Sequence, residues 1–383
     1  MIQKATLAVL TVLLIACIIT IATGNSFLIT GVQRTYLSGN ITANINDHKV
    51  FDVATIKTNN PNELPKSKDY NSIELEKDFK EQLIGTKSAA FLVIKDGEVV
   101  SENYFNGYDH RSKTNSFSMA KTVTTLLLGI AIEEGMIDSI EQNVTDFIPE
   151  FLDDELGKDA TIAQFSLMNS GYEWVEHYYS PFSPTVRLLY GHDVENYMLE
   201  GSFSKPPGEF FEYSSASTQI LGIVLDRAIK KHNAADSISD YLSKKIWQPM
   251  QMNDDALWHT DKKGMELVYC CINTNARNYA RLGLLMLNDG KWNNQQLVPA
   301  DFVKKMISPV AQPHYGYSTW LNYTKEPNYY WFSGHLGQYI MVVPQYNMII
   351  VRLGERRDSN VNFRETELPE YVRQAKRIIG AND

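Results

Sequence analysis

Ser118 and Lys121 stand three positions apart at the beginning of an apolar segment, and they are the first residues in the chain that point to covalent chemistry. In a helix, side chains at positions i and i+3 lie on the same face, one turn from each other. A serine hydroxyl is a weak nucleophile until a base removes its proton, and a lysine amine that is shielded from water can be that base. The pair therefore predicts a nucleophilic serine that is activated by a lysine.

The same Ser-x-x-Lys spacing occurs a second time, at Ser202 and Lys205. A Pro-Pro-Gly run at 206–208 follows that lysine directly and cannot continue a helix. The second lysine therefore has no reason to lie over its serine. The sequence context, and not the spacing alone, favours Ser118 as the nucleophile.

The segments on both sides of Ser118 predict how it is held. Two runs of β-branched and aromatic residues, at 89–94 and 98–105, are separated by an Asp-Gly turn and predict a β-hairpin. Residues 123–132 are apolar nearly all round, so the helix that begins near Ser118 is expected inside the core. A buried helix would keep its first turn, and the side chains on it, in a fixed position.

The rest of the chain predicts helices first and strands afterwards. From residue 138 to about residue 250 the pattern is helical with long loops, and further helices are expected over 275–289 and near Asp301. The last third predicts strands on short connections, which run antiparallel. These strands are expected at 315–323, 330–332, 338–343 and 348–353.

Together these elements predict an α+β domain over residues 88–370. Its antiparallel sheet is formed from both chain ends and flanked by helices, and a helical lobe at about 138–260 is inserted between the halves. Residues 25–87 are polar and mixed, and we expect them to be an N-terminal extension that leads to this domain.

The first residues of the chain predict a membrane segment. Residues 5–23 carry no charge and follow Lys4, and this length roughly spans a bilayer as one helix. A cleaved secretory signal usually has a shorter apolar region, of about 7–15 residues. We therefore expect residues 1–24 to anchor the protein in a membrane, with the catalytic domain extracytoplasmic, which means periplasmic in a bacterium. A lipoprotein attached at Cys17, or a secreted protein, is the second interpretation.

Composition and cysteine usage narrow the possible partners. The formal net charge is -9 and there is no Lys/Arg run, which argues against a nucleic-acid partner. The Cys and His residues lack metal-ligand spacing, so we expect no metal and no cofactor. Because adjacent cysteines make a strained and unusual disulfide, Cys270 and Cys271 are expected to be two unpaired, buried apolar residues.

Three short motifs follow one another along the chain: Ser118-Met119-Ala120-Lys121, Tyr213-Ser214-Ser215 and His335-Leu336-Gly337. They resemble the motifs of the serine β-lactamase and penicillin-binding-protein superfamily, which are Ser-x-x-Lys, Tyr-x-Asn and Lys-Thr-Gly or its His-x-Gly variant. A Pro-Pro-Gly-x-x-Phe-x-Tyr-Ser run and the stretches 270–283 and 334–339 are similar to the branch of esterases and 6-aminohexanoate-dimer hydrolases. The resemblance covers roughly residues 89–353 and implies a β-lactamase-like fold.

The resemblance also implies a role for each matched residue. Ser118 would be the acylated nucleophile and Lys121 its base, provided that burial depresses the lysine pKa from about 10.4. Tyr213 would complete a proton relay to the leaving group. His335 would face the cleft and help to bind or polarise the substrate. The backbone N–H groups of Ser118 and Gln338 would form the oxyanion hole.

Substrate binding is expected from Ser215, Gly337, Trp174 and Tyr178. The last two lie in an aromatic-rich loop that is either a wall or lid over the cleft or a satellite hydrophobic cluster. Ser215 stands where the superfamily has Asn, so its shorter hydroxyl would reach its partners through a water. His335 stands where β-lactamases usually keep Lys, and His is mostly neutral at pH 7. Both departures favour a small ester or a linear amide over a β-lactam.

The leading hypothesis is therefore a membrane-tethered serine hydrolase that forms an acyl-enzyme. One alternative is a non-catalytic cell-envelope binding or scaffold protein on the same fold, and another is a β-lactamase or D,D-peptidase. A third is a Ser–His mechanism with His335 as the base and Lys121 in a structural role. The expected partners are a small-molecule substrate and the membrane, and no oligomeric state is assigned.

Overall fold

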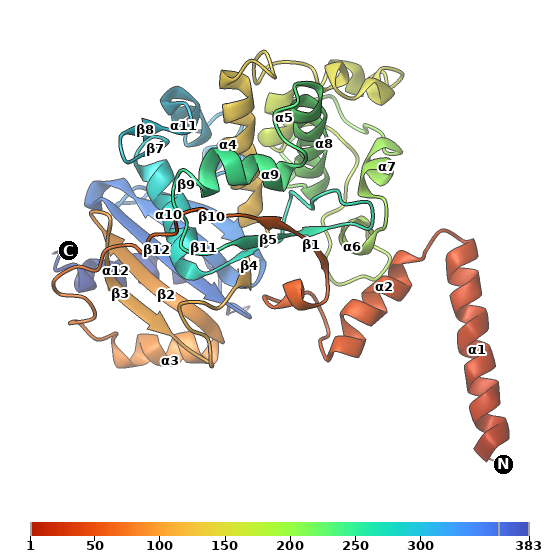
Figure 1. Ribbon diagram of the computed structural model, residues 1–383, viewed down its shortest axis with the longest axis horizontal. Helices are drawn as coiled ribbons and strands as arrows, with labels where there is room; N and C mark the ends of the chain where they lie inside the picture. The colour runs from red at the N-terminus through yellow and green to blue at the C-terminus, as the bar shows by residue number, and fades with distance from the viewer. Residues whose placement is uncertain (1, 359–360, 382–383) are drawn as a thin grey trace.

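The computed structural model describes residues 2–358 and 361–381, and its largest sheet has six antiparallel strands (Figure 1). The hairpin predicted from the sequence supplies two of them, β2 (Ser88–Lys95) and β3 (Glu98–Tyr104). The other four are β9 (Trp320–Asn322), β10 (Tyr329–Gly334), β11 (Gln338–Val343) and β12 (Met348–Gly354). Their order is β3-β2-β12-β11-β10-β9. Both chain ends therefore build one antiparallel sheet, as predicted.

The strand expected over 315–323 is shorter in the structure than in the prediction. Ser318 has φ 50°, in the left-handed region, and its backbone N–H donates to Ser166 O at 2.9 Å. Only residues 320–322 pair with β10. A strand ladder needs extended backbone, and the left-handed residue interrupts it.

Helices cover both faces of this sheet. One face is packed by α3 (Lys77–Gly85) and α12 (Glu367–Ile378), which contribute Phe79 and Tyr371 to a core around Phe91. The other face is packed by α4 (Met119–Glu133) and α10 (Ala276–Leu287). Successive strand residues point to opposite faces, so Phe91 belongs to the first core and Leu92 to the second.

Helix α4 is the buried helix that the sequence predicts, because every residue from Met119 to Ala131 is buried. It packs against α8 (Ser215–Lys231), the longest helix of the inserted lobe. The other lobe helices are α5 (Ile162–Ser166), α6 (Pro184–Tyr190), α7 (Val194–Leu199) and α9 (Ile238–Leu242). The predicted α+β architecture, with helices flanking an antiparallel sheet formed from both chain ends, is thus confirmed.

A second, four-stranded sheet was not predicted. Its order is β1-β5-β6-β4, with β1 (Asp52–Ile56), β5 (Ala256–Thr260), β6 (Ile272–Thr274) and β4 (Thr114–Asn115). These strands have two to five residues and come from three separate parts of the chain, so no local periodicity marks them. Because β4 ends three residues before Ser118, this sheet fixes the approach to the candidate nucleophile.

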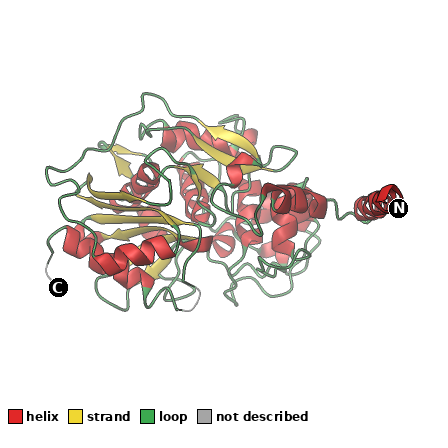
Figure 2. Ribbon diagram, turned by 90° about the horizontal axis from the view of Figure 1, so that it is seen from below, coloured by secondary structure: helices red, strands yellow, loops and turns green. Residues whose placement is uncertain are grey.

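Helix α1 (Ile2–Ala22) stands clear of the rest of the protein (Figures 1 and 2). The window from Lys4 to Ala22 has 19 residues, is apolar enough to cross a membrane and has no buried part. Residues 23–26 join it to α2 (Phe27–Arg34), which packs against α6. Helix α2, which follows α1 directly, is therefore part of the folded domain.

The remaining elements are short. They are the strands β7 (Lys291–Trp292) and β8 (Gln295–Gln296), the helix α11 (Ala300–Met306), a π-helical turn (Ser243–Trp247) and the 3₁₀ turns Tyr36–Ser38, Asp47–Lys49, Val144–Asp146, Pro149–Phe151, Gly157–Asp159, His335–Gly337 and Pro344–Tyr346. Helix α11 lies where a helix was expected near Asp301.

Candidate active site

Ser118 lies at the N-terminal end of α4, half-buried and facing a pocket. The turn before it is tied down: Phe117 has φ 45°, and Ser116 N donates to Ile272 O at 2.7 Å. Ser118 occupies the N-cap position, but its side chain makes no capping hydrogen bond, so the hydroxyl is available for other partners. A helix N-terminus presents free N–H groups and the positive end of a dipole, which favour a developing oxyanion.

Lys121 is fully inside the protein, with 1% of its surface exposed. Its Nζ donates to Ser118 Oγ at 3.2 Å, to Ser215 Oγ at 3.2 Å and to Tyr269 O at 3.0 Å. Burial lowers the pKa of Lys121 to about 8, and the negative charge of Glu176 works in the opposite direction. At that pKa roughly one amine in ten is neutral at pH 7, so Lys121 can accept a proton.

Tyr213 is the third residue at the nucleophile. A hydrogen bond links its side chain to Ser118, and its ring centroid lies 5.1 Å from Lys121 Nζ. Burial is the largest cause that raises the pKa of Tyr213 well above its ordinary value, so the phenol keeps its proton at neutral pH. The ring stacks on Trp320 of β9 with centroids 5.5 Å apart, which fixes its orientation. Three residues predicted from distant motifs are thus brought together.

Glu176 is a residue of this site that was not predicted. Its carboxylate accepts a hydrogen bond from Ser215 N at 2.8 Å and one from Ser215 Oγ at 2.7 Å. Two aromatic side chains also donate to it at 2.7 Å, Trp174 through Nε1 and Tyr178 through its hydroxyl. Ser215 therefore connects Glu176 to Lys121 directly, and the water that we expected between Ser215 and its partners is not needed.

One signal in the sequence could have identified Glu176. Trp174, Glu176 and Tyr178 alternate along the loop, and in extended chain residues at i and i+2 point to the same side. The two aromatic residues were predicted to bind substrate, but their polar atoms are bound to Glu176. The residues of this loop lie in two environments: Tyr172 packs in the main hydrophobic core, while Tyr178 and Phe182 line the pocket.

His335 faces the same pocket from the turn between β10 and β11. Its ring centroid lies 4.9 Å from that of Tyr178 and 5.5 Å from that of Phe117. Burial, with help from the charge of Arg357, lowers the pKa of His335 to about 4, so the imidazole is neutral at pH 7. His335 therefore lines the pocket without a positive charge at pH 7.

The turn that carries His335 is held by Arg352, which donates to Leu336 O at 2.9 Å and to Gly337 O at 2.8 Å. Gly337 has φ 86°, and a Cβ there would lie 2.4 Å from Nη1 of Arg352. The carbonyl oxygen of Gly337 therefore accepts a hydrogen bond from Arg352 within the protein. Gly337 is not among the residues that line the pocket, although it was predicted to bind substrate.

Gln338 begins β11, and its side chain is bound within the sheet. Nε2 donates to Gly354 O at 2.7 Å, and Oε1 accepts from Gly354 N at 3.0 Å. The turn approaches the nucleophile closely, since a Cβ on Gly334 would lie 2.2 Å from Ser116 O. The backbone N–H of Gln338, and not its amide, is the group that remains a candidate for the oxyanion hole with the N–H of Ser118.

Cys270 and Cys271 are bonded to each other, so the expectation of two unpaired cysteines was wrong. Both are buried, as expected. Cys271 has φ 78°, a conformation outside the extended backbone in which neighbouring side chains point apart. The disulfide lines the pocket directly after Tyr269, whose carbonyl accepts from Lys121.

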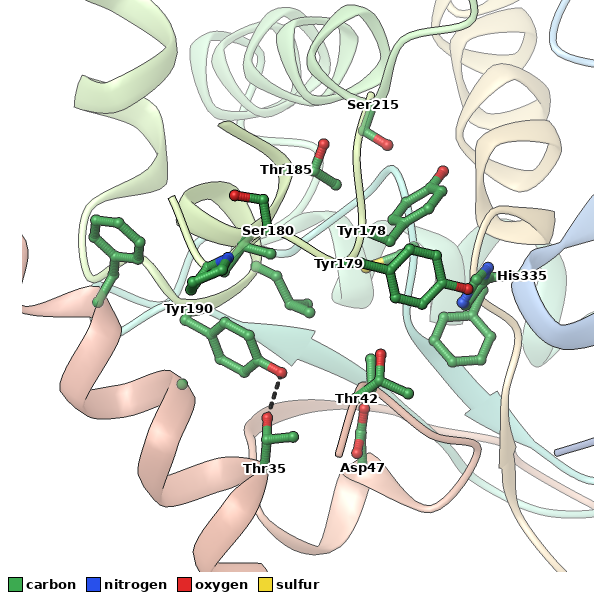
Figure 3. A pocket seen from close by; sticks show the side chains of 18 of the residues that line it. Thr35, Thr42, Asp47, Tyr178, Tyr179, Ser180, Thr185, Tyr190, Ser215 and His335 are labelled. Carbon is green, nitrogen blue, oxygen red and sulfur yellow. Dashed lines mark hydrogen bonds between the residues drawn. The ribbon is translucent and has the colours of Figure 1, made fainter. Parts of the chain in front are cut away.

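The pocket has a volume of about 360 Å³, and Ser118 is among the residues that line it. Ser215, Tyr178 and His335 line it as well (Figure 3). This volume lies in the range of small-molecule sites, which is roughly 300–1,000 Å³. Within residues 2–358 and 361–381, no group of three or more His, Cys, Asp or Glu side chains is arranged to hold a metal ion. This arrangement is suited to nucleophilic attack by Ser118, because the buried Lys121 and the protonated Tyr213 are both hydrogen-bonded to it.

The chain is similar to several known proteins. A family model described as Beta-lactamase matches residues 75–370. The 6-aminohexanoate-dimer hydrolase of Paenarthrobacter ureafaciens is 25% identical over 303 residues, which cover 72% of this chain and 74% of that protein.

Two solved structures share the fold. One is a Bacillus anthracis protein described as a 6-aminohexanoate-dimer hydrolase, with a TM-score of 0.76 and 23% identity, covering 88% of this chain and 94% of that one. The other is a family VIII carboxylesterase, with a TM-score of 0.61 and 16% identity, covering 82% of this chain and 98% of that one.

Proposed function

The chain belongs to the Beta-lactamase family of serine hydrolases, which has esterase and amidase members, and we propose that it cleaves a small ester or linear amide through an acyl-enzyme on Ser118. The observation that carries this proposal is the position of Lys121 Nζ, 3.2 Å from Ser118 Oγ in a buried site. The relatives support the substrate class, because one is named for an amide dimer and another for carboxylic esters.

In the proposed reaction, neutral Lys121 takes the proton of Ser118 while Oγ attacks the substrate carbonyl. The backbone N–H groups of Ser118 and Gln338 stabilise the oxyanion. Collapse of this intermediate breaks the ester or amide bond, and the leaving alcohol or amine receives a proton through Tyr213. A water then attacks the acyl-enzyme by the same route in reverse, which releases the carboxylic acid and restores Ser118.

His335 supports an ester or linear amide in preference to a β-lactam. Its pKa of about 4 makes it neutral at pH 7, at the position where β-lactamases keep a cationic Lys for the substrate carboxylate. Glu176 accepts two hydrogen bonds from Ser215, which itself accepts one from Lys121, so we assign Glu176 a positioning role.

We also propose that α1 anchors the protein in a membrane, with the catalytic domain outside the cytoplasm. The support is the length of the apolar window, 19 residues, and the absence of any buried part within it. A core helix of this composition would be buried, as α4 is.

The nucleophile is tested by covalent labelling. A fluorophosphonate should add to the wild-type chain in a one-to-one ratio, and mass spectrometry of the digest should place the adduct on the peptide that contains Ser118. Ser118→Ala should take up no label, whereas Ser202→Ala, in the other Ser-x-x-Lys sequence, should be labelled like the wild type. An adduct that persists in Ser118→Ala would refute this assignment.

The pH dependence of turnover tests the base. Because only neutral Lys121 accepts the proton and its pKa is about 8, kcat/KM should rise about tenfold per unit between pH 5.5 and 7 and level off above pH 8. The measurement is the initial rate of p-nitrophenyl butyrate hydrolysis, corrected for the spontaneous rate at each pH. If His335 were the base, its pKa of about 4 would make the profile flat from pH 5.5 upward.

A further inference from the structure

The pocket that contains Ser118 continues away from the catalytic residues as an apolar space between α2 and α6 (Figure 3). We call this part the apolar end. The side chains that define it come from these two helices: Phe27, Leu28 and Val32 on α2, and Val186, Leu189 and Tyr190 on α6. One continuous cavity therefore joins the nucleophile to the helix that follows α1.

Three polar side chains near the apolar end, Thr35, Tyr190 and Asp47, are already hydrogen-bonded within the protein. Thr35 Oγ1 and the hydroxyl of Tyr190 are hydrogen-bonded at 2.7 Å. The carboxylate of Asp47 accepts from Asn44 N at 2.9 Å and from Asn44 Nδ2 at 2.6 Å. Burial also raises the pKa of Asp47 to about 7, so its charge is weakened near neutral pH. An occupant of this space therefore meets hydrocarbon and satisfied polar groups, which suits a hydrocarbon chain.

The mouth of the pocket carries apolar side chains that face water. Val32, Ile41, Tyr179 and Phe182 all line the pocket, and their exposed fractions are 48%, 86%, 71% and 73%. Exposed large apolar side chains that gather at one place mark a contact with a membrane or a partner. They come from two segments, the one just after α1 and the aromatic-rich loop, so local sequence does not explain the cluster.

The position of this mouth favours the membrane as its contact. Only residues 23–26 separate α1 from α2, and α2 supplies one wall of the apolar end. A four-residue connection spans at most about 14 Å even when fully extended. With α1 in a bilayer, the exposed apolar rim lies at the bilayer surface, where hydrocarbon chains are available.

We propose that the apolar end binds the acyl chain of an ester that enters from the bilayer, with the ester carbonyl at Ser118. The inference rests on the proposed acyl-enzyme function. Ser118 Oγ bonds to the acyl carbon, the C–O bond to the alcohol breaks, and the alcohol leaves with a proton. Water then hydrolyses the acyl-enzyme, and a long-chain carboxylic acid is released.

The first test compares acyl-chain lengths on the full-length chain reconstituted in phosphatidylcholine vesicles. Each methylene that is buried adds up to about a fourfold gain, so kcat/KM should be at least about tenfold higher for p-nitrophenyl octanoate than for the acetate. Gly31→Phe should fill the apolar end, since a Cβ there already lies 3.4 Å from the Tyr190 ring. It should lower octanoate turnover at least about tenfold and leave acetate turnover unchanged.

Matched variants separate the pocket from folding effects. Gly85→Phe places the same side chain at a helix glycine with open space around it, and it should turn over both esters like the wild type. Val32→Asp puts a charge on the half-exposed rim and should reduce octanoate turnover selectively, whereas Val310→Asp, at a similarly exposed valine, should not.

The second test concerns the source of the ester. Long-chain methylumbelliferyl oleate should be hydrolysed at least about tenfold faster when it is in the same vesicles as the enzyme than when it is in separate vesicles. Equal rates would overturn entry from the bilayer. Equal turnover of acetate and octanoate, unchanged by Gly31→Phe, would overturn acyl-chain binding and leave the hydrolase intact. A wild type that turns over neither ester and takes up no fluorophosphonate would overturn the proposed function itself.

Discussion

Lys121→Met should lower kcat/KM for p-nitrophenyl butyrate by about 10²–10⁴-fold, because general-base catalysis typically contributes that much. The substitution removes the amine that lies 3.2 Å from Ser118 Oγ and keeps a side chain of similar length in a fully buried place. Thermal unfolding and fluorophosphonate labelling, measured on the same preparation, separate loss of the base from loss of the fold. If Lys121→Met is folded, the fluorophosphonate should add to its Ser118 much more slowly than to that of the wild type.

Two companion variants make the result specific. Lys205→Met changes the lysine of the other Ser-x-x-Lys sequence, which is ion-paired with Glu212 at the surface, and it should leave kcat/KM unchanged. His335→Ala should reduce kcat/KM by less than tenfold, since the histidine contacts the pocket but does not bind Ser118 Oγ in this site. The reverse pattern, an active Lys121→Met and an inactive His335→Ala, would establish the Ser–His mechanism instead.

Glu176→Gln should lower kcat/KM by about 10- to 100-fold and move its pH profile to lower pH. A hydrogen bond to a charged group is worth about 1.5–3 kcal/mol, and the variant weakens the bonds from Ser215 that keep this residue against Lys121. The shift in pH has a separate cause. The negative charge of Glu176 raises the pKa of Lys121, so without it the amine becomes neutral at a lower pH.

The profile is measured from pH 5.5 to 9 for Glu176→Gln and for Glu173→Gln. Glu173 lies in the same loop but is exposed, so its variant should match the wild type in rate and in pH midpoint. A purely structural role for Glu176 predicts lower stability with an unmoved midpoint. That outcome would show that the charge of Glu176 does not affect the pKa of Lys121.

Local patterns in the sequence were sufficient for the main elements. The hairpin β2–β3 followed from two runs of β-branched and aromatic residues around an Asp-Gly turn, and the burial of α4 followed from its apolar residues on every side. The antiparallel strands of the last third followed in the same way, apart from the left-handed residue Ser318 that shortens β9. Periodicity is a property of neighbouring residues, and it is visible wherever an element is long enough.

The four-stranded sheet and the Cys270–Cys271 disulfide could not be predicted from local sequence patterns. Strands of two to five residues are too short to alternate visibly, and the pairings β1–β5 and β4–β6 join residues more than a hundred positions apart. The Cys270–Cys271 bond depends on one positive φ, which residue type alone does not predict outside glycine. Both features depend on contacts that form only when the chain has folded.

By itself, the sequence determined the fold class and the identity of Ser118, Lys121 and Tyr213 as the residues that meet, because three ordered motifs and a buried helix carry that information. Only the tertiary structure decided what surrounds them: the carboxylate of Glu176 behind Ser215, the burial that lowers the pKa of His335 to about 4, and the apolar end of the pocket beside α2. The physical reason is the sequence distance over which the determining interactions act. A helix or turn is set by residues a few positions apart, whereas burial, pKa and pocket shape are set by whichever distant segments pack against it.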